Sequence, residues 1–180
     1  MDLGIAGKVA LVTGASAGIG AAIARRLDQI ARRSEKLNEV REGLTGANAK
    51  QALIQVCDVT KAEEVSNAVS CTLERFGTID ILVNNAGGLT TGDLLPFDSL
   101  SDQTFIDNYA LNVMSAVKFI RAVLPSMRQQ HWGRIVSISS ESAVQPDAEV
   151  PITTPPKRRL MRSRKPCPRR TRPKAFFSTW

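Results

Sequence analysis

A glycine-rich stretch near the amino end, residues 13–20 (TGASAGIG), has the composition of a phosphate-binding turn. It follows the apolar run KVALV and precedes small and apolar residues at helical spacing. Gly14, Gly18 and Gly20 let the backbone turn sharply and approach a pyrophosphate, and the amino end of the next helix offers unpaired N–H groups and partial positive charge. A tight turn that binds no ligand is the alternative.

Further polar residues suited to binding a nucleotide or a carbonyl oxygen occur later in the chain. They are Asp58 in CDV, Asn85 in NNAG, Asn112 in YALNVMSA and Ser140 in GRIVSISS. Open parallel sheets bind ligands beyond the carboxyl ends of their strands, which is where most of these residues fall. A plain strand-end serine and a polar residue on a helix surface are the alternatives for Ser140 and Asn112.

These groups need a scaffold of alternating strands and helices, which the apolar patterns predict. Strands are expected over residues 8–14, 51–59, 79–87 and 133–140. Helices are expected after residue 18, over residues 60–77 with Thr60 as N-cap, and over residues 101–130 as one long helix or a pair. This alternation predicts an α/β fold with a doubly wound parallel sheet.

Taken in order, the motifs resemble those of the classical short-chain dehydrogenase/reductase family, with a likeness to its 3-oxoacyl reductases. TGASAGIG matches the family's TGxxxGxG loop, CDV its adenine-contacting Asp–Val, and NNAG the signature after its fourth strand. Asn112 matches its long-helix Asn, and Ser140 the position of its catalytic Ser. The resemblance covers residues 5–150 and implies a Rossmann-like NAD(P)-binding domain over residues 1–150.

The resemblance implies hydride transfer between a nicotinamide cofactor and a carbonyl or alcohol substrate. The three cysteines show neither CxxC spacing nor nearby histidines, so no metal site is expected. Arg32 and Arg33 stand where the family's second strand ends; an arginine there favours NADP, with NAD possible, and a solvated helix start is the alternative. The cofactor-binding residues it implies are Thr13, Gly14, Ser16, Ala17, Gly18, Ile19, Gly20, Arg32, Arg33, Asp58, Val59, Asn85, Ala86 and Gly87.

The family's catalytic set is incomplete in this chain. By resemblance, Ser140 would hold the substrate oxygen and Asn112 would support a water relay to a lysine. The family's Tyr-x-x-x-Lys pair should begin about a dozen residues after Ser140, where the chain reads PITTPPKRR. The single tyrosine, Tyr109, precedes Asn112, and Lys157 has no tyrosine four residues before it. We therefore expect an oxidoreductase by descent that is inactive or severely impaired.

A shifted reading frame near Pro151 explains the missing pair. When the third base of each codon is joined to the first two of the next, Ile152 into Thr153 reads as Tyr, and the following junctions are compatible with Asn-Ser-Ala-Lys. That text restores a tyrosine and a lysine at the family's spacing. We interpret residues 151–180 as a basic, Pro-rich, irregular tail that is out of frame.

The tail also carries the chain's positive charge. Of the 24 basic residues, 10 lie in residues 151–180, which contain no acidic residue; residues 1–150 hold 14 basic and all 17 acidic residues. A basic arm for nucleic acid or an anionic surface is one alternative function, and a non-catalytic dinucleotide-binding module is another. Under a frame shift we expect neither a nucleic-acid nor a membrane partner.

A second loss is expected near the amino end. Compared with the family pattern, roughly seven residues, enough for its second strand, are absent between Leu27 and Arg32. That strand lies between the first and third in the family, so we expect an incomplete sheet, lacking also the C-terminal strands, with an exposed edge at the strand over residues 133–140. The family's homo-oligomer becomes doubtful. No signal sequence or membrane span is seen, so we expect a cytoplasmic protein.

Overall fold

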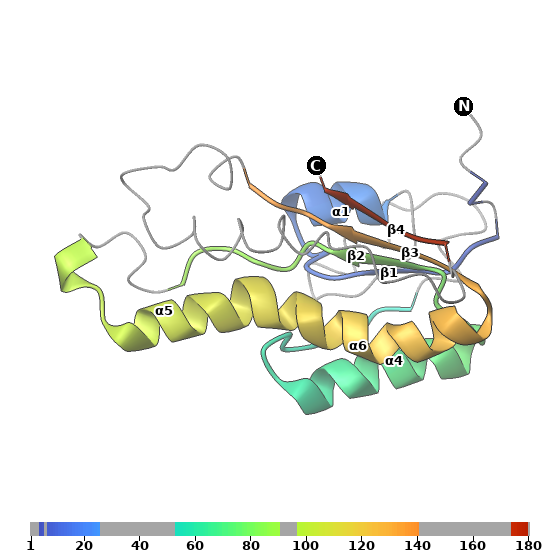
Figure 1. Ribbon diagram of the computed structural model, residues 1–180, viewed down its shortest axis with the longest axis horizontal. Helices are drawn as coiled ribbons and strands as arrows, with labels where there is room; N and C mark the ends of the chain where they lie inside the picture. Colours follow the sequence, from blue (N-terminus) through green and yellow to red (C-terminus); the bar gives the residue numbers. More distant parts are fainter. Residues whose placement is uncertain (1–3, 6, 26–52, 91–96, 141–173, 180) are drawn as a thin grey trace.

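The computed structural model describes residues 4, 5, 7–25, 53–90, 97–140 and 174–179. They form strands and helices in alternation (Figure 1). The helical turn η1 is 3₁₀, η2 is a π-helical turn, and α5, η2 and α6 follow one another without a break. The elements are β1 (Ala10–Val12), α1 (Gly18–Ala24), α4 (Ala62–Phe76), β2 (Ile81–Asn84), η1 (Phe97–Ser99), α5 (Asp102–Tyr109), η2 (Ala110–Met114), α6 (Ser115–Gln129), β3 (Trp132–Ser137) and β4 (Lys174–Thr179).

The four strands form one parallel sheet in the order β1-β2-β3-β4. Val12 is opposite Val83, and Val83 is opposite Val136, so β1, β2 and β3 are aligned at their carboxyl ends. Every residue of β1 and β2 is buried, as expected for strands covered by helices on both faces. The predicted α/β fold with a parallel sheet is confirmed.

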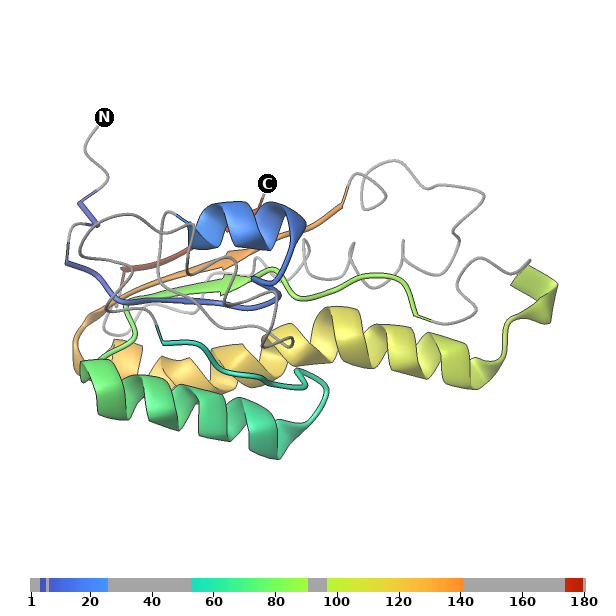
Figure 2. The same cartoon turned by 180° about the vertical axis from the view of Figure 1, so that it is seen from behind.

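Helices cover the sheet from both sides (Figures 1 and 2). On one face α1 lies over a cluster that includes Val12, Ala24 and Val83. On the other face α4 and α6 lie side by side over a larger cluster that includes Leu82, Phe119 and Ile135. Successive strand residues point to opposite faces, which is why neighbours such as Leu82 and Val83 belong to different clusters.

The strand expected over residues 51–59 is not formed in its described part. Residues 53–58 have neither helix nor strand, and residues 59–60 form a turn. By the resemblance this segment would pair with the family's second strand, and residues 27–32, where that strand is expected to be missing, lie outside the described residues. Within the described part β1 has no partner but β2. Ile54 still packs on the α1 face, while Cys57 and Val59 are buried on the α4 face.

The expected N-cap of α4 is also wrong. The helix begins at Ala62, and its N-cap residue, Lys61, makes no side-chain capping bond. Thr60 instead donates its hydroxyl to Asp58 Oδ1 at 2.7 Å, and its backbone N–H reaches the same oxygen at 3.0 Å. Asp58 competes successfully because its carboxylate accepts both donors in one short turn.

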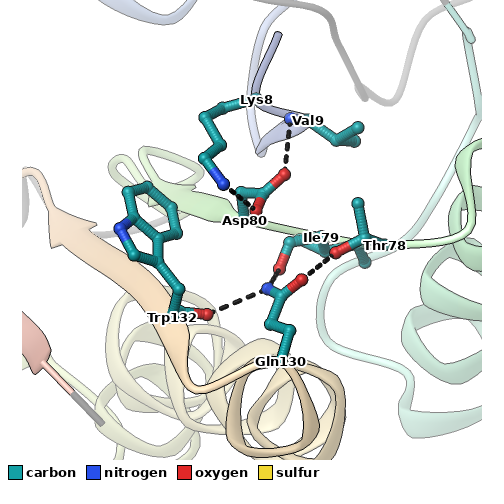
Figure 3. A network of polar contacts seen from close by, with 7 residues as sticks. All are labelled: Lys8, Val9, Thr78, Ile79, Asp80, Gln130 and Trp132. Atoms are coloured by element: carbon teal, nitrogen blue, oxygen red, sulfur yellow. Dashed lines mark hydrogen bonds and ion pairs between the residues drawn. The ribbon is translucent and has the colours of Figure 1, made fainter. Parts of the chain in front are cut away.

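A polar network joins the amino-terminal ends of the strands (Figure 3). Asp80 accepts hydrogen bonds from Lys8 Nζ at 3.2 Å and from the Val9 backbone N–H at 2.9 Å. Gln130 donates to the backbone carbonyls of Ile79 and Trp132, and accepts from the Thr78 hydroxyl. These contacts join the starts of β1, β2 and β3 and so help to fix the register of the three strands at their carboxyl ends.

The edge of β3 is covered by the end of the tail. β4 pairs with β3 in parallel along its whole length, from Trp132 opposite Lys174 to Ser137 opposite Thr179. The expectation of an irregular tail and an exposed edge is therefore wrong for these six residues. The sequence KAFFST lacks proline and has two aromatic residues that favour strands, unlike the Pro-rich part before it. Residues 151–173 lie outside the described residues.

The segment Asp102–Gln129 is apolar and long enough to meet a length-and-composition criterion for a membrane span. The same apolar residues have partners inside the fold: Phe119, Val123 and Met127 are buried in the cluster beneath α6. Packing on the sheet therefore accounts for the hydropathy of this helix, as for the core helix of any α/β layer.

Candidate functional site

The glycine-rich loop leaves β1 and approaches the loop after β2 closely. Gly14 has φ +64°, and a Cβ there would lie 2.8 Å from Ala86 Cα. A Cβ on Gly20 would lie 2.3 Å from Asn85 Nδ2 and 2.4 Å from the Gly14 carbonyl oxygen. Only glycine fits at these two positions, because any side chain would push the two loops apart.

Thr13 and Asn85 hold the two loops together through reciprocal hydrogen bonds. The buried Thr13 hydroxyl accepts from the backbone N–H groups of Asn85, at 3.0 Å, and Ala86, at 2.9 Å. In return, Asn85 Nδ2 donates to the carbonyl oxygens of Thr13 and Gly14, each at 3.1 Å. The structure thus brings together five of the predicted cofactor residues: Thr13, Gly14, Gly20, Asn85 and Ala86.

The other predicted residues of the glycine-rich loop face outward. Ala17, Gly18 and Ile19 are exposed, and a Cβ on Gly18, whose φ is +54°, would meet no atom within 4 Å. Ser16 is half-buried. α1 begins here with no side-chain cap and no acidic residue in its first turn. Open backbone with uncapped N–H groups fits a phosphate-bearing cofactor.

Asn112 is buried within the π-helical turn and grips the loop after β2. Its Oδ1 accepts from the Gly88 N–H at 3.0 Å, and its Nδ2 donates to the Gly88 carbonyl at 2.9 Å. Gly87 passes so close that a Cβ there would lie 2.8 Å from Asn112 Oδ1. The side chain thus holds the loop in place. From the sequence we expected Asn112 to support a water relay and did not predict this contact. π-helical turns recur at functional sites, and this one contains the predicted site residue Asn112.

Ser140 follows the carboxyl end of β3 by three residues and is half-buried. The backbone pairing there runs on past the strand, since the Ile138 N–H donates to the Asn84 carbonyl at 2.8 Å. Two buried polar atoms, Ser139 Oγ just before Ser140 in the sequence and Asn84 Oδ1 at the end of the neighbouring strand β2, have no hydrogen-bond partner among the described residues. Tyr109 lies in α5, ahead of the π-helical turn, as predicted.

Asp58 and Val59 lie at a turn just before α4. Val59 is buried in the core beneath α4, so its side chain contributes packing. The Asp58 N–H donates to Glu64 Oε2 at 2.6 Å, and this bond, followed by the bond from Lys61, holds the pKa of Glu64 below its usual value. The same carboxylate raises the pKa of Lys61, whose Nζ lies 3.0 Å from Glu64 Oε1. Arg32 and Arg33 lie outside the described residues.

Sequence reasoning missed two residues that complete the site. Gly88, one residue beyond NNAG, is the partner of Asn112. Asn108, which is fully buried, also contacts Asn112. Its spacing was an available signal, because residues four apart on a helix are neighbours. No pattern in the sequence indicated the unpaired oxygens of Asn84 and Ser139.

Comparisons with known proteins agree with this geometry. Residues 8–152 match the short chain dehydrogenase family. An uncharacterized oxidoreductase of Staphylococcus saprophyticus is 40% identical over 149 residues, which cover 75% of this chain and 59% of that protein. The chain thus spans about 60% of the length of the curated relatives it matches.

Two solved structures are similar as well. L-sorbose reductase from Gluconobacter frateurii, complexed with NADPH and L-sorbose, is 36% identical with a TM-score of 0.82, covering 89% of this chain and 63% of that one. NAD⁺-bound xylitol dehydrogenase is 31% identical with a TM-score of 0.76, covering 86% and 61%.

Proposed function

The chain belongs to the short chain dehydrogenase family, and we propose that it binds a nicotinamide dinucleotide without turning over a substrate. The observation that carries this proposal is the pair of reciprocal hydrogen bonds between Thr13 and Asn85, which joins the glycine-rich loop to the loop after β2 as one unit. Beside that unit, α1 opens with exposed, uncapped backbone. A bound dinucleotide is the group that would use both features.

This chain's residues would divide the cofactor between them. The backbone of residues 17–19 and the first turn of α1 would bind the pyrophosphate, as open helix N-termini do. Asp58 would hydrogen-bond the adenine edge, and residues 85–87 would line the nicotinamide-side ribose. The bound nicotinamide would supply a hydride donor or acceptor. In relatives of this kind the substrate is a small alcohol or carbonyl compound, such as the L-sorbose held by one neighbour.

NADP is the proposed cofactor, on the strength of Arg32 and Arg33, whose guanidinium groups suit a 2′-phosphate. The solved neighbours do not decide between the two cofactors, since one was complexed with NADPH and the other with NAD⁺. Replacing both arginines with glutamine tests the choice: affinity for NADPH should fall about tenfold or more while affinity for NADH is unchanged. Equal losses for both would contradict the assignment.

The proposed lack of turnover follows from the missing proton donor. Ser140 remains to hold a substrate oxygen, but the position of the family's tyrosine falls in PITTPPK. The family match stops at residue 152, next to the proposed frame shift, which supports reading residues 151–180 as an out-of-frame segment. Loss of a general acid alone costs roughly 10²–10⁴-fold in rate.

Fluorescence titration with NADPH and NADH, paired with a turnover assay on ketones including L-sorbose, tests the proposal. We expect saturable binding of NADPH and no measurable oxidation of it. Absence of binding to either dinucleotide by a chain with a cooperative melt would overturn the binding claim. Turnover within about tenfold of an intact relative would overturn the claim of inactivity.

A further inference from the structure

Asn108, near the end of α5, has an amide side chain in the interior of the protein. Its exposed fraction is 0%, and it ranks among the largest fully buried side chains of the described residues. An amide in that position costs free energy unless its polar atoms are hydrogen-bonded, so a buried asparagine on the inner face of a helix calls for a specific partner.

Asn112, one helical turn later, is one such partner. Asn112 Nδ2 lies 3.2 Å from Asn108 Oδ1 and 3.1 Å from the Asn108 backbone oxygen, besides its bond to the Gly88 carbonyl. The side-chain NH₂ of Asn112 therefore donates toward three acceptor oxygens. Rotating the amide by 180° would set Asn112 Oδ1 against these oxygens and its NH₂ against the Gly88 N–H, so Asn108 helps to select the observed orientation.

The geometry points to Asn108 as a positioning residue for the dinucleotide site, acting through Asn112 on the loop after β2. One end of that loop, Asn85 and Ala86, is bound by Thr13 on the β1 side. The other end, Gly88, is bound from the helix side by Asn112. Asn108 thus governs the second anchor, next to the ribose that carries the nicotinamide. This inference rests on the proposed function in naming the ligand.

Three variants separate positioning from a general contribution to stability. Asn108→Leu keeps the branching at Cγ and removes the acceptor, and Asn108→Asp keeps an acceptor oxygen facing Asn112. Thr72→Val is the matched control, because it removes a buried hydroxyl that donates to the Ala68 carbonyl within α4, away from the loop. All three should retain a cooperative melt.

Amide hydrogen exchange and ligand binding give the readouts. In Asn108→Leu, exchange at the Gly88 N–H should accelerate about tenfold, as expected for a lost buried hydrogen bond. NADPH affinity should fall by a similar factor, while affinity for adenosine 2′,5′-bisphosphate, which lacks the nicotinamide half, should not change. Asn108→Asp should restore most of both, and Thr72→Val should alter neither.

Several outcomes would overturn the inference. Unchanged Gly88 exchange in a folded Asn108→Leu variant is one, and equal affinity losses for NADPH and the bisphosphate are another. If Asn108→Leu does not fold, the unaltered chain still provides a test. Side-chain amide protons of Asn112 that exchange as fast as those of exposed Asn67 would exclude a stable hydrogen bond between Asn112 and Asn108. Failure of the unaltered chain to bind either nucleotide would count against the proposed function, and Gly88 exchange would then judge Asn108 independently.

Discussion

The side-chain amide of Asn112 pairs with both backbone groups of Gly88, accepting from its N–H at 3.0 Å and donating to its carbonyl at 2.9 Å. A single side chain thereby forms the two hydrogen bonds that a neighbouring strand would form with the backbone of Gly88, four residues after the end of β2. Asn112 is buried in the π-helical turn, and its side chain reaches the loop from there.

Asn112→Leu should lower the free energy of unfolding by about 1–3 kcal/mol, because it leaves the Gly88 groups unpaired where water has little access. Urea unfolding followed by circular dichroism measures the change. Asn67→Leu, at an exposed position of α4, is the control and should stay within about 0.5 kcal/mol. Equal effects at the two positions would contradict a special role for the Asn112–Gly88 pair.

Thr13→Val should cost about 2–4 kcal/mol, since two backbone N–H groups, those of Asn85 and Ala86, lose their common acceptor. Thr13→Ser keeps the hydroxyl and should stay within about 1 kcal/mol of the unaltered chain. Thermal melts of the two variants give the comparison. A valine variant as stable as the serine variant would show that these N–H groups find other partners.

Gly20→Ala should separate the two loops, because its methyl group would lie 2.3 Å from Asn85 Nδ2. We expect a loss of about 1–3 kcal/mol in stability and a matching loss of dinucleotide affinity. Gly77→Ala, at the left-handed C-cap of α4 with no atom within 4 Å of its Cβ, is the control. It should cost stability through backbone strain and leave dinucleotide affinity unchanged.

The pair of Asp58 and Glu64 predicts a small acid-dependent loss of stability. The pKa of Glu64 is lowered in the folded chain, so its contribution is present above the ordinary value of 4.5 and is lost as pH falls through the folded value. As the pH falls below 4.5, urea midpoints should therefore decrease more steeply in the unaltered chain than in Glu64→Gln. The effect should be modest because the carboxylate is exposed. Parallel pH profiles would contradict it.

The sequence predicts some elements of this fold correctly and others wrongly. Strand cores and the order of motifs were predictable, because buried parallel strands are short apolar runs that end in glycine or asparagine. The described part of the segment around Cys57 was wrongly predicted as a strand, since an apolar pattern does not show whether a neighbouring strand pairs with it. β4 was missed because the prolines and charge of the preceding tail outweighed six strand-forming residues. The spacing of Asn108 and Asn112 indicates that they are neighbours on a helix, but no local pattern indicates that Asn112 reaches Gly88 on the loop after β2.

Restoring the reading frame after codon 151 should produce an active reductase. The restored text supplies tyrosine and lysine at the family's spacing, about a dozen residues after Ser140, and the family match that stops at residue 152 should extend beyond it. NADPH oxidation with ketones should rise by at least about 10²–10⁴-fold over the present chain, the range for a general acid. In the restored chain, exchanging the recovered tyrosine for phenylalanine should abolish that gain while leaving NADPH binding intact. A stop codon directly after the shift, or a restored chain that binds NADPH without oxidising it, would show that the tail does not conceal the missing half of the active site.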